Sequence, residues 1–469
     1  MSGLARLLCA RGARLSGSDQ TASDVTAALV REGIPVTIEP EGELPEDAEI
    51  LVVSAAVRPD HPQWVAAESR GLPVLTYAQA LGRCMEGRTG VAVAGTHGKS
   101  TTVAMLGHAL IQSGLEPSVI VGAACAQLAR EGGAPTGFRL GADAVPTGAL
   151  AERPGLLIAE ACEFNRSFHQ LVPTVASVSA VEADHLDIYG SLDAVVEAFN
   201  VFARRLPHED DGGRLLIGHD GAHRREVAAG VVARVETVGF APGADWRVGY
   251  DSAESRVSLV TPDGASIEWV MRLPGEHNAL NSAFAAAHAI TVGADPARVA
   301  DALSGFTGLA RRLENLGETA GVRVYDDYGH HPTEIDATLR ALRDHDRPQD
   351  RGGRLVCVFQ PHQHSRTRFL LDEFAQSFSQ ADIVIVPHIY FVRDSETELT
   401  RVQAGDLVDK LRDRGVRAMH LYPFEAIIEQ LEVACRPGDL LVVMGAGPVW
   451  KVARGFIDAM SAQPAGSAP

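Results

Sequence analysis

The sequence predicts an α/β protein of several domains, and two observations carry this prediction. Short apolar runs, which are typical of buried parallel strands, alternate along the chain with longer stretches of helical periodicity. Polar or glycine-containing motifs follow directly after several of these runs, where open α/β sheets place their ligand-binding groups. A chain of 469 residues with 46% apolar content can form several cores. We expect three domains, at residues 1–86, 87–308 and 309–469.

The first domain is predicted to be half of a doubly wound, Rossmann-like unit. Helical patterns cover residues 2–11 and 25–32, and residues 49–54 are typical of a buried strand. Units of this kind usually begin with a strand and a glycine-rich loop. Here the order starts with a helix, so we expect this domain to lack its first strand.

The second domain opens with a phosphate-binding motif, Val91-Ala-Val-Ala-Gly-Thr-His-Gly-Lys-Ser-Thr-Thr102, which joins an apolar run to a helical pattern. Lys99 is one of only three lysines among 42 basic residues. Loop N–H groups and the helix N-terminus would face an anion, Lys99 would reach its terminal phosphates, and Ser100 can ligate Mg²⁺. The alternative is a glycine-rich turn that opens an ordinary helix. The motif predicts that a nucleoside triphosphate is bound by Gly95, Thr96, His97, Gly98, Lys99, Ser100 and Thr101.

Carboxylate and imidazole groups follow the next two apolar runs of this domain. The run 156–159 ends at Glu160, and a carboxylate beside a phosphate loop can hold Mg²⁺. The run 175–178 precedes Glu182-Ala-Asp-His-Leu-Asp187, in which His185 is a candidate for a second metal site or a substrate contact. An edge carboxylate facing solvent and a structural histidine are the alternatives.

An alanine-rich helix and a hairpin complete the predicted second domain. Residues 257–270 are typical of a hairpin that turns at 262–264. Asn278 and Asn281, three residues apart, lie on one face of the expected helix and could present amides to a planar base. N-capping by Asn278 is the alternative.

The third domain is predicted to be parallel α/β, with strands at 322–325, 354–359, 383–387 and 439–444. A dense polar cluster, Tyr325-Asp-Asp-Tyr-Gly-His-His-Pro-Thr-Glu334, follows the first strand, and a helix should begin near Pro332. Successive side chains such as His330 and His331 point apart, which disfavours zinc and favours ligand binding at a domain junction.

A second polar segment, Phe359-Gln-Pro-His-Gln-His-Ser-Arg-Thr-Arg368, follows the next strand. Arg366 could clamp a carboxylate through two parallel hydrogen bonds, and a solvated basic turn is the alternative. Gly445-Ala-Gly447, after the last strand, is weak evidence by itself.

Composition excludes several classes of protein. The net charge of −18 argues against a nucleic-acid partner, which would require a basic face. Six scattered cysteines without a Cys-x-x-Cys pair indicate reduced thiols. No apolar stretch approaches the roughly 18 residues of a membrane span, and the N-terminus lacks the apolar core of a signal peptide. We expect a cytoplasmic enzyme.

With these residues in view, the chain resembles the Mur ligase family over essentially its whole length. The motifs that carry the resemblance occur in the family's order: Gly95-Thr-His-Gly-Lys-Ser-Thr101, Glu160-Ala-Cys-Glu163, Glu182-Ala-Asp-His-Leu-Asp187, His277-Asn-Ala-Leu-Asn281, Arg311-Arg-Leu-Glu314, Asp326-Asp-Tyr-Gly-His-His-Pro-Thr-Glu334 and Gln360-Pro-His-Gln-His-Ser-Arg-Thr-Arg368. The resemblance implies a UDP-substrate-binding domain, a central P-loop ATPase domain and a C-terminal Rossmann-like domain that binds amino acid and nucleotide.

The resemblance also implies a reaction, the ATP-dependent ligation of L-alanine to UDP-N-acetylmuramate in peptidoglycan synthesis, which supports cell shape and division. ATP phosphorylates the muramyl carboxylate, and the amine of alanine attacks the acyl phosphate. By the family pattern, Lys99, Glu160 and His185 are catalytic, Ser100 and Glu160 serve one Mg²⁺, and His185 serves a second. The pattern assigns the nucleotide to Asn278, Asn281, Arg312 and Asp327, and L-alanine to Tyr328, His330 and Arg366.

Three features depart from the family pattern. Relatives usually carry a strand and a glycine-rich loop before the segment that here is Met1-Ser-Gly-Leu-Ala5, so we expect a misassigned start or impaired binding of the UDP-substrate. Gln363 stands where the family often has arginine, which removes a cation from the expected alanine site. No lysine lies between Lys99 and Lys410 to form the carbamylated lysine of several relatives. A related peptide-recycling ligase and a non-catalytic nucleotide-binding relative are the alternative interpretations.

Overall fold

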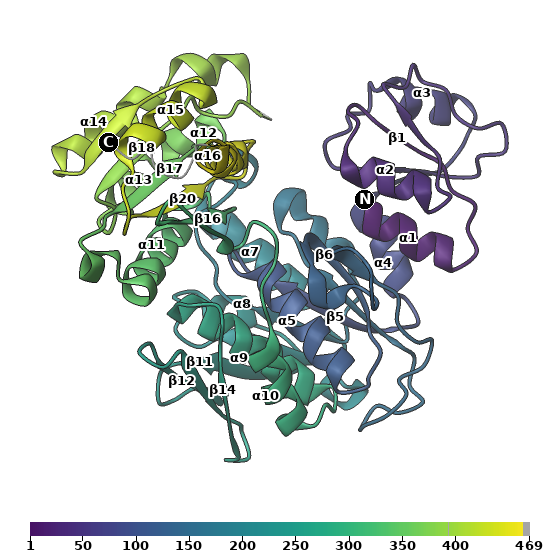
Figure 1. Cartoon of the computed structure of the whole chain (residues 1–469). Helices are drawn as coiled ribbons and strands as arrows, with labels where there is room; N and C mark the ends of the chain where they lie inside the picture. The colour runs from purple at the N-terminus through teal and green to yellow at the C-terminus, as the bar shows by residue number, and fades with distance from the viewer. Residues whose placement is uncertain (393, 463–469) are drawn as a thin grey trace. The chain divides into compact units, whose positions relative to one another are not determined.

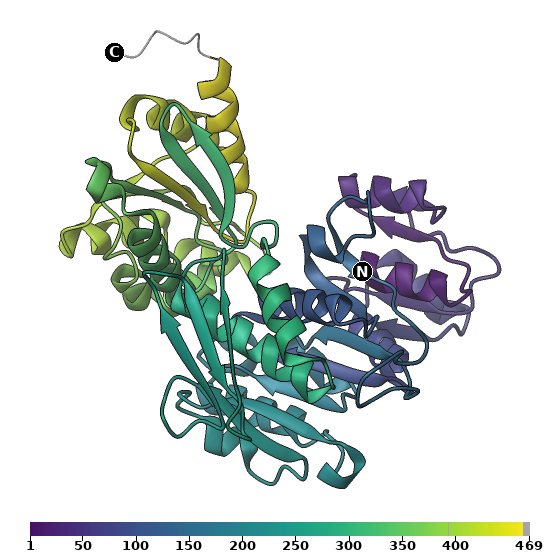
Figure 2. The same ribbon diagram turned by 60° about the horizontal axis from the view of Figure 1, so that its bottom comes forward.

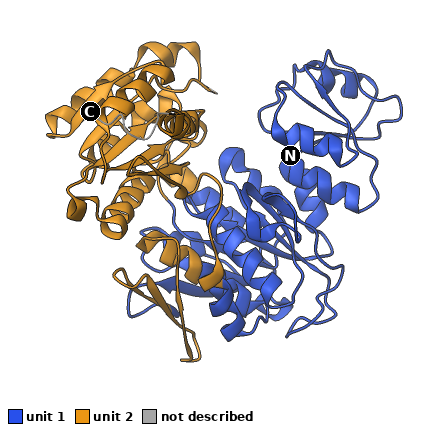
Figure 3. Ribbon diagram, viewed as in Figure 1, with its two compact units in different colours: residues 1–181, 196–246, 284–302 blue, residues 182–195, 247–283, 303–469 orange. Residues whose placement is uncertain are grey.

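The structure, a computed structural model, describes residues 1–392 and 394–462 and contains two compact units (Figure 3). Unit 1 comprises residues 1–181, 196–246 and 284–302, and unit 2 comprises residues 182–195, 247–283 and 303–469. Helices and strands alternate along the chain (Figure 1), which confirms the predicted α/β class. Among the described residues, no helix is long and apolar enough to cross a membrane.

The N-terminal segment of unit 1 carries four short strands in two separate parallel pairs, β1-β2 and β3-β4. In the described chain no strand joins the two pairs. The predicted helices and the strand at 49–54 are found, and the strand is shorter than expected. The elements are α1 (Ser2–Ala10), β1 (Gly17–Asp19), α2 (Asp24–Arg31), β2 (Val36–Ile38), β3 (Leu51–Val53), α3 (Pro62–Ser69), β4 (Val74–Thr76) and α4 (Tyr77–Met85).

The rest of unit 1 is built on a sheet with strand order β11-β10-β9-β5-β8-β6-β7. β5 lies between β9 and β8 and is parallel to both, while the edge strand β7 is antiparallel to β6. The three apolar runs predicted as strands are β5, β8 and β9. The strands are β5 (Thr89–Ala94), β6 (Ser118–Cys125), β7 (Thr136–Arg139), β8 (Leu156–Glu160), β9 (Val175–Val178), β10 (Arg214–Gly218) and β11 (Arg234–Gly239).

Helix α5 (Lys99–Gln112) covers β5, β6 and β8 (Figure 2). Every residue from Ser100 to Leu110 is buried, so this part of the helix is covered on all sides. Gly107 allows the close approach, because a Cβ atom there would lie 3.1 Å from Cγ2 of Val119. The helix that follows the phosphate loop is therefore fixed along most of its length.

Helices α7 (Leu192–Ala203), α9 (Glu276–Thr291) and α10 (Pro296–Gly305) cross the division between the units. Shorter helices in this region are α6 (Leu186–Tyr189) and α8 (Arg224–Ala228). The predicted hairpin at 257–270 is confirmed in unit 2 by β13 (Arg256–Val260) and β14 (Ser266–Val270), and β12 (Trp246–Asp251) pairs antiparallel with β13.

The buried histidine of α9 gives a testable pH dependence of stability. His288 is 0% exposed, and neither ring nitrogen has a hydrogen-bond partner within the described chain. Burial lowers the pKa of His288 to about 3. Below the ordinary pKa of about 6.5, the unfolded chain takes up a proton that the folded chain does not, so stability is lost as pH falls.

At pH 5 this loss amounts to about 2 kcal/mol. His288→Leu should therefore lose less stability than wild type between pH 7 and pH 5, measured as the shift in the urea midpoint. His208→Ala removes a half-exposed imidazole (52% side-chain exposure) and should keep the wild-type shift. Equal shifts in all three proteins would contradict the prediction.

The C-terminal part of unit 2 forms a six-stranded sheet with order β15-β16-β20-β17-β18-β19, parallel except for the pair β15-β16. Successive residues of β17 and β20 alternate between two apolar cores, one on each face of the sheet. The four predicted strands are confirmed. The strands are β15 (Glu314–Thr319), β16 (Val322–Asp327), β17 (Leu355–Phe359), β18 (Ile383–Val386), β19 (Arg417–His420) and β20 (Leu440–Met444).

Helices cover both faces of this sheet, and α16 packs against β15, β16 and β20 (Figure 2). As predicted, α11 begins at Pro332, after the capping residue His331 and with Glu334 in its first turn. The helices are α11 (Pro332–Asp346), α12 (His364–Phe369), α13 (Leu371–Gln376), α14 (Ala404–Asp413), α15 (Phe424–Ala434) and α16 (Trp450–Ala462).

Candidate active site

The phosphate loop of unit 1 runs from the end of β5 to the start of α5 and depends on two glycines. Gly95 has φ +134°, and a Cβ atom there would lie 2.1 Å from Oγ of Ser179. Gly98 has φ +79° at the N-cap position of α5. Ser179 also donates a hydrogen bond to the carbonyl of His97 at 3.0 Å. The loop is thus held by the chain after β9 while the N-terminus of α5 stays open to an anion.

The ammonium group of Lys99 is folded back on this loop. Its Nζ donates to the carbonyls of Gly95 at 2.6 Å and Thr96 at 3.1 Å, and lies 2.9 Å from Oε2 of Glu163. Burial acts to lower the pKa of Lys99, but the carboxylate of Glu163 outweighs it, and the pKa is raised. Lys99 is therefore a fixed cation at neutral pH.

Two carboxylates follow β8, and only one of them contacts Lys99 directly. Glu160, the last residue of β8, accepts a hydrogen bond from the backbone N–H of Gly122 at 2.8 Å and acts on Lys99 through longer-range charge. Glu163 is 4% exposed and forms the ion pair. The sequence analysis quoted Glu163 within its motif but gave it no role. Ser100 and Thr101 are buried in the first turn of α5.

A cavity of about 640 Å³ lies in unit 1 at the carboxyl ends of β3 and β4. Its wall includes the aromatic side chains of Trp64 and Tyr77 and the cations Arg58 and Arg166. Asn165 and Arg166, also in the wall, both have left-handed backbones with φ of +51° and +53°. This conformation is uncommon for a residue with a side chain, and of the two Asn165 tolerates it better than Arg166.

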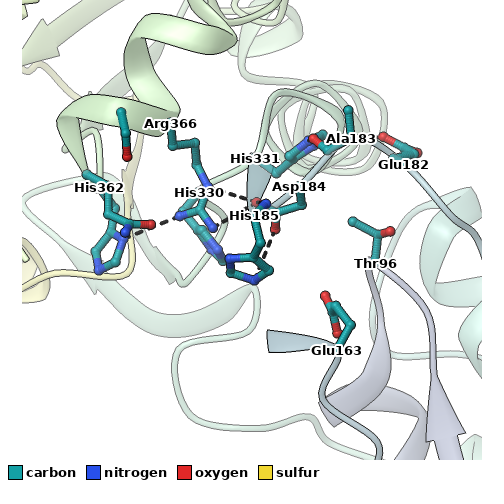
Figure 4. A network of polar contacts seen from close by, with 12 residues as sticks. Thr96, Glu163, Glu182, Ala183, Asp184, His185, His330, His331, His362 and Arg366 are labelled. Carbon is teal, nitrogen blue, oxygen red and sulfur yellow. Dashed lines mark hydrogen bonds and ion pairs between the residues drawn. The ribbon is translucent and has the colours of Figure 1, made fainter. Parts of the chain in front are cut away.

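In unit 2, Arg366 of α12 forms a buried ion pair with Asp184. Its Nε and Nη2 donate to Oδ1 of Asp184 at 3.0 and 2.9 Å (Figure 4). His185 has φ +53°, its backbone N–H donates to the same Oδ1 at 2.7 Å, and its Nε2 lies 3.6 Å from Oδ2. The sequence analysis gave Asp184 no role, although it quoted the residue.

Tyr328 and His330 stand together on the loop between β16 and α11. The rings of Tyr328 and His330 meet edge to face at 5.5 Å, and Arg312 lies 4.8 Å above the ring of Tyr328. His330 Nδ1 and the carbonyl oxygen of Tyr328 are 3.1 Å apart. Since a carbonyl oxygen can only accept, Nδ1 carries the proton and donates it in this hydrogen bond. Burial lowers the pKa of His330 to about 4, so its imidazole is neutral at neutral pH.

Asp327 shapes the loop on which these residues lie. Its two carboxylate oxygens accept the backbone N–H groups of Leu313 and Gly329, each at 2.6 Å. Burial raises the pKa of Asp327 to about 6, although Arg312 and the two N–H donors act against this rise. The carboxylate thus orders the chain around Arg312.

The neighbouring Arg311 donates to the carbonyls of Gly445 and Gly447 at 2.6 and 3.2 Å. The Gly-x-Gly segment, weak evidence in the sequence, is therefore attached to the Arg311-Arg312 motif.

Asn278 and Asn281 lie side by side in the first turns of α9. Asn278 Nδ2 donates to the carbonyl of Pro274 at 2.9 Å and its Oδ1 accepts from Asn281 Nδ2 at 3.4 Å. α9 begins at Glu276, so Asn278 is inside the helix and does not cap it. The residues expected to bind ligands therefore fall into two groups, the phosphate loop and Glu160 in unit 1, and the remaining residues in unit 2.

Gln363, the departure from the family pattern, is buried with φ +71° at the start of α12. Its backbone N–H donates to the carbonyl of Tyr390 at 3.1 Å. The adjacent His364 donates its backbone N–H to Asp394, which also accepts from the hydroxyl of Ser365 at 2.5 Å. Gln363 carries no charge, so the buried cation of this turn is Arg366.

Comparison with known proteins decides the family. Three family profiles match consecutive parts of the chain: "Mur ligase family, catalytic domain" over residues 1–89, "Mur ligase middle domain" over 93–289 and "Mur ligase, glutamate ligase domain" over 311–447. The UDP-N-acetylmuramate–L-alanine ligase of Kineococcus radiotolerans is 40% identical over 96% of this chain and 92% of its own length. The chain belongs to the Mur ligase family. The protein of the same name from Thermobifida fusca is 38% identical to this Mur ligase over 98% of the chain and 94% of its own length.

Solved structures share the fold of this Mur ligase. The UDP-N-acetylmuramate–alanine ligase of Thermotoga maritima has a TM-score of 0.77 at 22% identity and covers 98% of this chain and 96% of its own. A murein peptide ligase from Psychrobacter arcticus has a TM-score of 0.71 at 24% identity and covers 99% and 97%. The predicted three-domain Mur ligase architecture is confirmed, and the chain is a ligase. The boundaries at 86 and 308 stay predictions.

Proposed function

We propose that this Mur ligase joins L-alanine to UDP-N-acetylmuramate with the conversion of ATP to ADP and phosphate, in the cytoplasm, as a step of peptidoglycan synthesis. The observation that carries the proposal is the phosphate loop with its cationic, partly buried Lys99, in a chain 40% identical to a ligase of that name. In the proposed reaction ATP phosphorylates the muramyl carboxylate, and the amine of alanine displaces phosphate from the acyl phosphate.

Unit 1 supplies the groups for phosphoryl transfer in this proposal. Catalysis of this step consists of positioning and charge neutralisation. The backbone from Gly95 to Thr101 would surround the phosphates, and Lys99 would exchange its contacts with Gly95 and Thr96 for phosphate oxygens. The hydroxyl of Ser100 and the carboxylate of Glu160 are hard oxygen donors that suit Mg²⁺, which when bound offsets phosphate charge. His185 in unit 2 is proposed as a ligand of a second Mg²⁺.

The cavity at β3 and β4 fits a nucleotide sugar. Its volume of about 640 Å³ is in the range of small-molecule sites. Trp64 and Tyr77 offer ring faces for a base, and Arg58 and Arg166 offer guanidinium groups for diphosphate oxygens. We therefore assign UDP-N-acetylmuramate to this cavity.

Unit 2 supplies the groups for the amino acid and for part of the nucleotide. Arg366 would bind the carboxylate of L-alanine, and Tyr328 and His330 would line its methyl and amine groups. Asn278, Asn281, Arg312 and Asp327 are proposed to hold the nucleotide. For Asp327 we propose an indirect role, because both of its oxygens already accept backbone N–H groups.

The experiment that tests the function is a coupled assay of ADP release. Release should require both UDP-N-acetylmuramate and L-alanine, and mass spectrometry should find the amide product. The tripeptide acceptor of a murein peptide ligase should not replace L-alanine. ADP release that ignores either substrate, or that prefers the tripeptide, would overturn the assignment.

The roles of Glu160 and Glu163 can be distinguished by how each substitution changes the Mg²⁺ dependence of ADP release. Glu160→Gln should raise the Mg²⁺ concentration for half-maximal ADP release by about 10-fold or more, since loss of a group that only orients a metal ligand already weakens affinity by about 10- to 100-fold. Glu131→Gln, in the exposed loop before β7, serves as the control and should leave the titration unchanged. If Glu163→Gln alone shifts the titration, Glu163 and not Glu160 is the ligand.

A further inference from the structure

Asp184 connects two residues that the proposed reaction uses. Arg366 and Asp184 are 182 positions apart in the sequence, and each is only 7% exposed. Oδ1 of Asp184 accepts three hydrogen bonds, two from the guanidinium of Arg366 and one from the backbone N–H of His185 (Figure 4). One carboxylate oxygen therefore fixes both the side chain of Arg366 and the backbone conformation at His185.

The geometry of the pair limits how Arg366 can bind a substrate. A guanidinium is a rigid, planar fork with five N–H groups, and it offers a carboxylate either its Nε/Nη2 edge or its Nη1/Nη2 edge. Asp184 occupies the Nε/Nη2 edge, at 3.0 and 2.9 Å. Nη1 donates one N–H to Nδ1 of His362 at 3.4 Å and keeps its second N–H. The Nη1/Nη2 edge, beside His362, is the edge that remains for another carboxylate. The contacts with Asp184 thus orient the flexible side chain of Arg366 before any substrate arrives.

We propose that Asp184 is a positioning residue for the amino-acid substrate, which holds Arg366 so that only its Nη1/Nη2 edge, beside His362, receives the substrate carboxylate. The inference rests on the proposed function, in which Arg366 binds the carboxylate of L-alanine. Asp184 itself touches no substrate in this scheme. Because Asp184 already restricts the Arg366 side chain, less conformational entropy is lost when alanine binds.

The deciding variant is Asp184→Glu, which keeps the negative charge but adds a methylene and displaces the guanidinium. We expect the KM for L-alanine to rise about 10-fold or more, since misplacement of a binding group by about 1 Å can cost 10²-fold. The KM for UDP-N-acetylmuramate should change by less than about 2-fold, because this substrate uses neither Arg366 nor His185. Any fall in kcat, through the contact of Asp184 with the backbone of His185, should be smaller than the rise in the KM for L-alanine. Asp184→Asn should show the same selective rise if it folds.

A matched control lies at the opposite end of the same sheet. Asp439, just before β20, is 0% exposed and pairs with Arg354 through contacts of 2.5 and 3.3 Å. Asp439→Glu alters a buried arginine pair of the same kind away from the site, and it should leave the KM for L-alanine unchanged. If Asp184→Glu behaves like this control, or raises all three KM values together, Asp184 has a structural role only and the proposal is wrong.

A double-variant cycle tests whether Asp184 acts through Arg366. Arg366→Lys alone should raise the KM for L-alanine, because a single ammonium cannot offer a two-point edge. Combined with Asp184→Glu it should add little, since the orientation is already lost. Fully additive effects would overturn the proposal. If the wild-type protein itself forms no product with L-alanine, the proposed function fails, and this outcome is distinct from a selective failure in the variants.

Discussion

Lys99→Ala should reduce product formation by about 10³-fold or more, with kcat as the parameter most affected. Lys99 is the cation of the phosphate loop, and its pair with Glu163 keeps it protonated. Its charge is needed most when the phosphoryl group is in transit, because negative charge spreads over the equatorial oxygens at that point. The measurement is the steady-state rate of ADP release with saturating UDP-N-acetylmuramate and L-alanine.

The control for this variant is Lys410→Ala. Lys410 is also paired with a carboxylate, at 2.6 Å from Asp372, but its side chain is 41% exposed on α14. It should retain wild-type kcat. Near-ultraviolet circular dichroism should show that both variants keep native packing. A Lys99→Ala protein that is native by this measure and retains more than about a tenth of the activity would contradict the role given to Lys99.

Gly95→Ala should lower kcat/KM for ATP by about 10²-fold, since the backbone of the loop must move by an ångström or more to accept the new atom. The added Cβ would lie 2.1 Å from Oγ and 3.0 Å from the backbone nitrogen of Ser179. The backbone nitrogen cannot rotate away, so the loop or the end of β9 must shift. The φ of +134° adds strain for any residue with a side chain.

Gly114→Ala is the control that separates the steric clash of an added Cβ from the backbone strain of a positive φ. Gly114 follows α5 with φ +76°, and a Cβ atom there would meet only Cγ2 of Thr147 at 3.9 Å. This variant should lose some stability and keep its kcat/KM for ATP. Calorimetric titration with a non-hydrolysable ATP analogue should show weakened binding only in Gly95→Ala. Equal binding by the two variants would mean that the loop does not require glycine at position 95.

The buried strands and the loops that follow them could be predicted from the sequence because each depends on neighbouring residues. β5, β8, β17 and β20 each contain a continuous apolar run, as expected for strands covered on both faces. Two interior strands, β6 and β10, were missed although they are largely apolar, and strands at the sheet edges were missed as well. β15 and β19 have exposed or half-buried positions and polar residues, so their sequences resemble loops.

The partners of the charged site residues could not be predicted, since they are distant in the sequence. Lys99 and Glu163 are 64 positions apart, and Asp184 and Arg366 are 182 apart. Both carboxylates stood in motifs that the sequence analysis quoted, but a motif does not show which cation it faces. Asp327 illustrates the same limit. Its carboxyl was expected to bind a nucleotide, and the fold places two backbone N–H groups against it.

The sequence by itself determined the family, the α/β class and the positions of the phosphate loop and the polar motifs. These features are local, because a strand, a glycine turn and a helix start are each specified within a few residues. Tertiary structure alone decided the charge and orientation of the groups within them. Lys99 is protonated because Glu163 is buried against it, and the Nε/Nη2 edge of Arg366 is taken because Asp184 accepts from it. Both effects arise from burial and from contacts between distant segments, which no local pattern encodes.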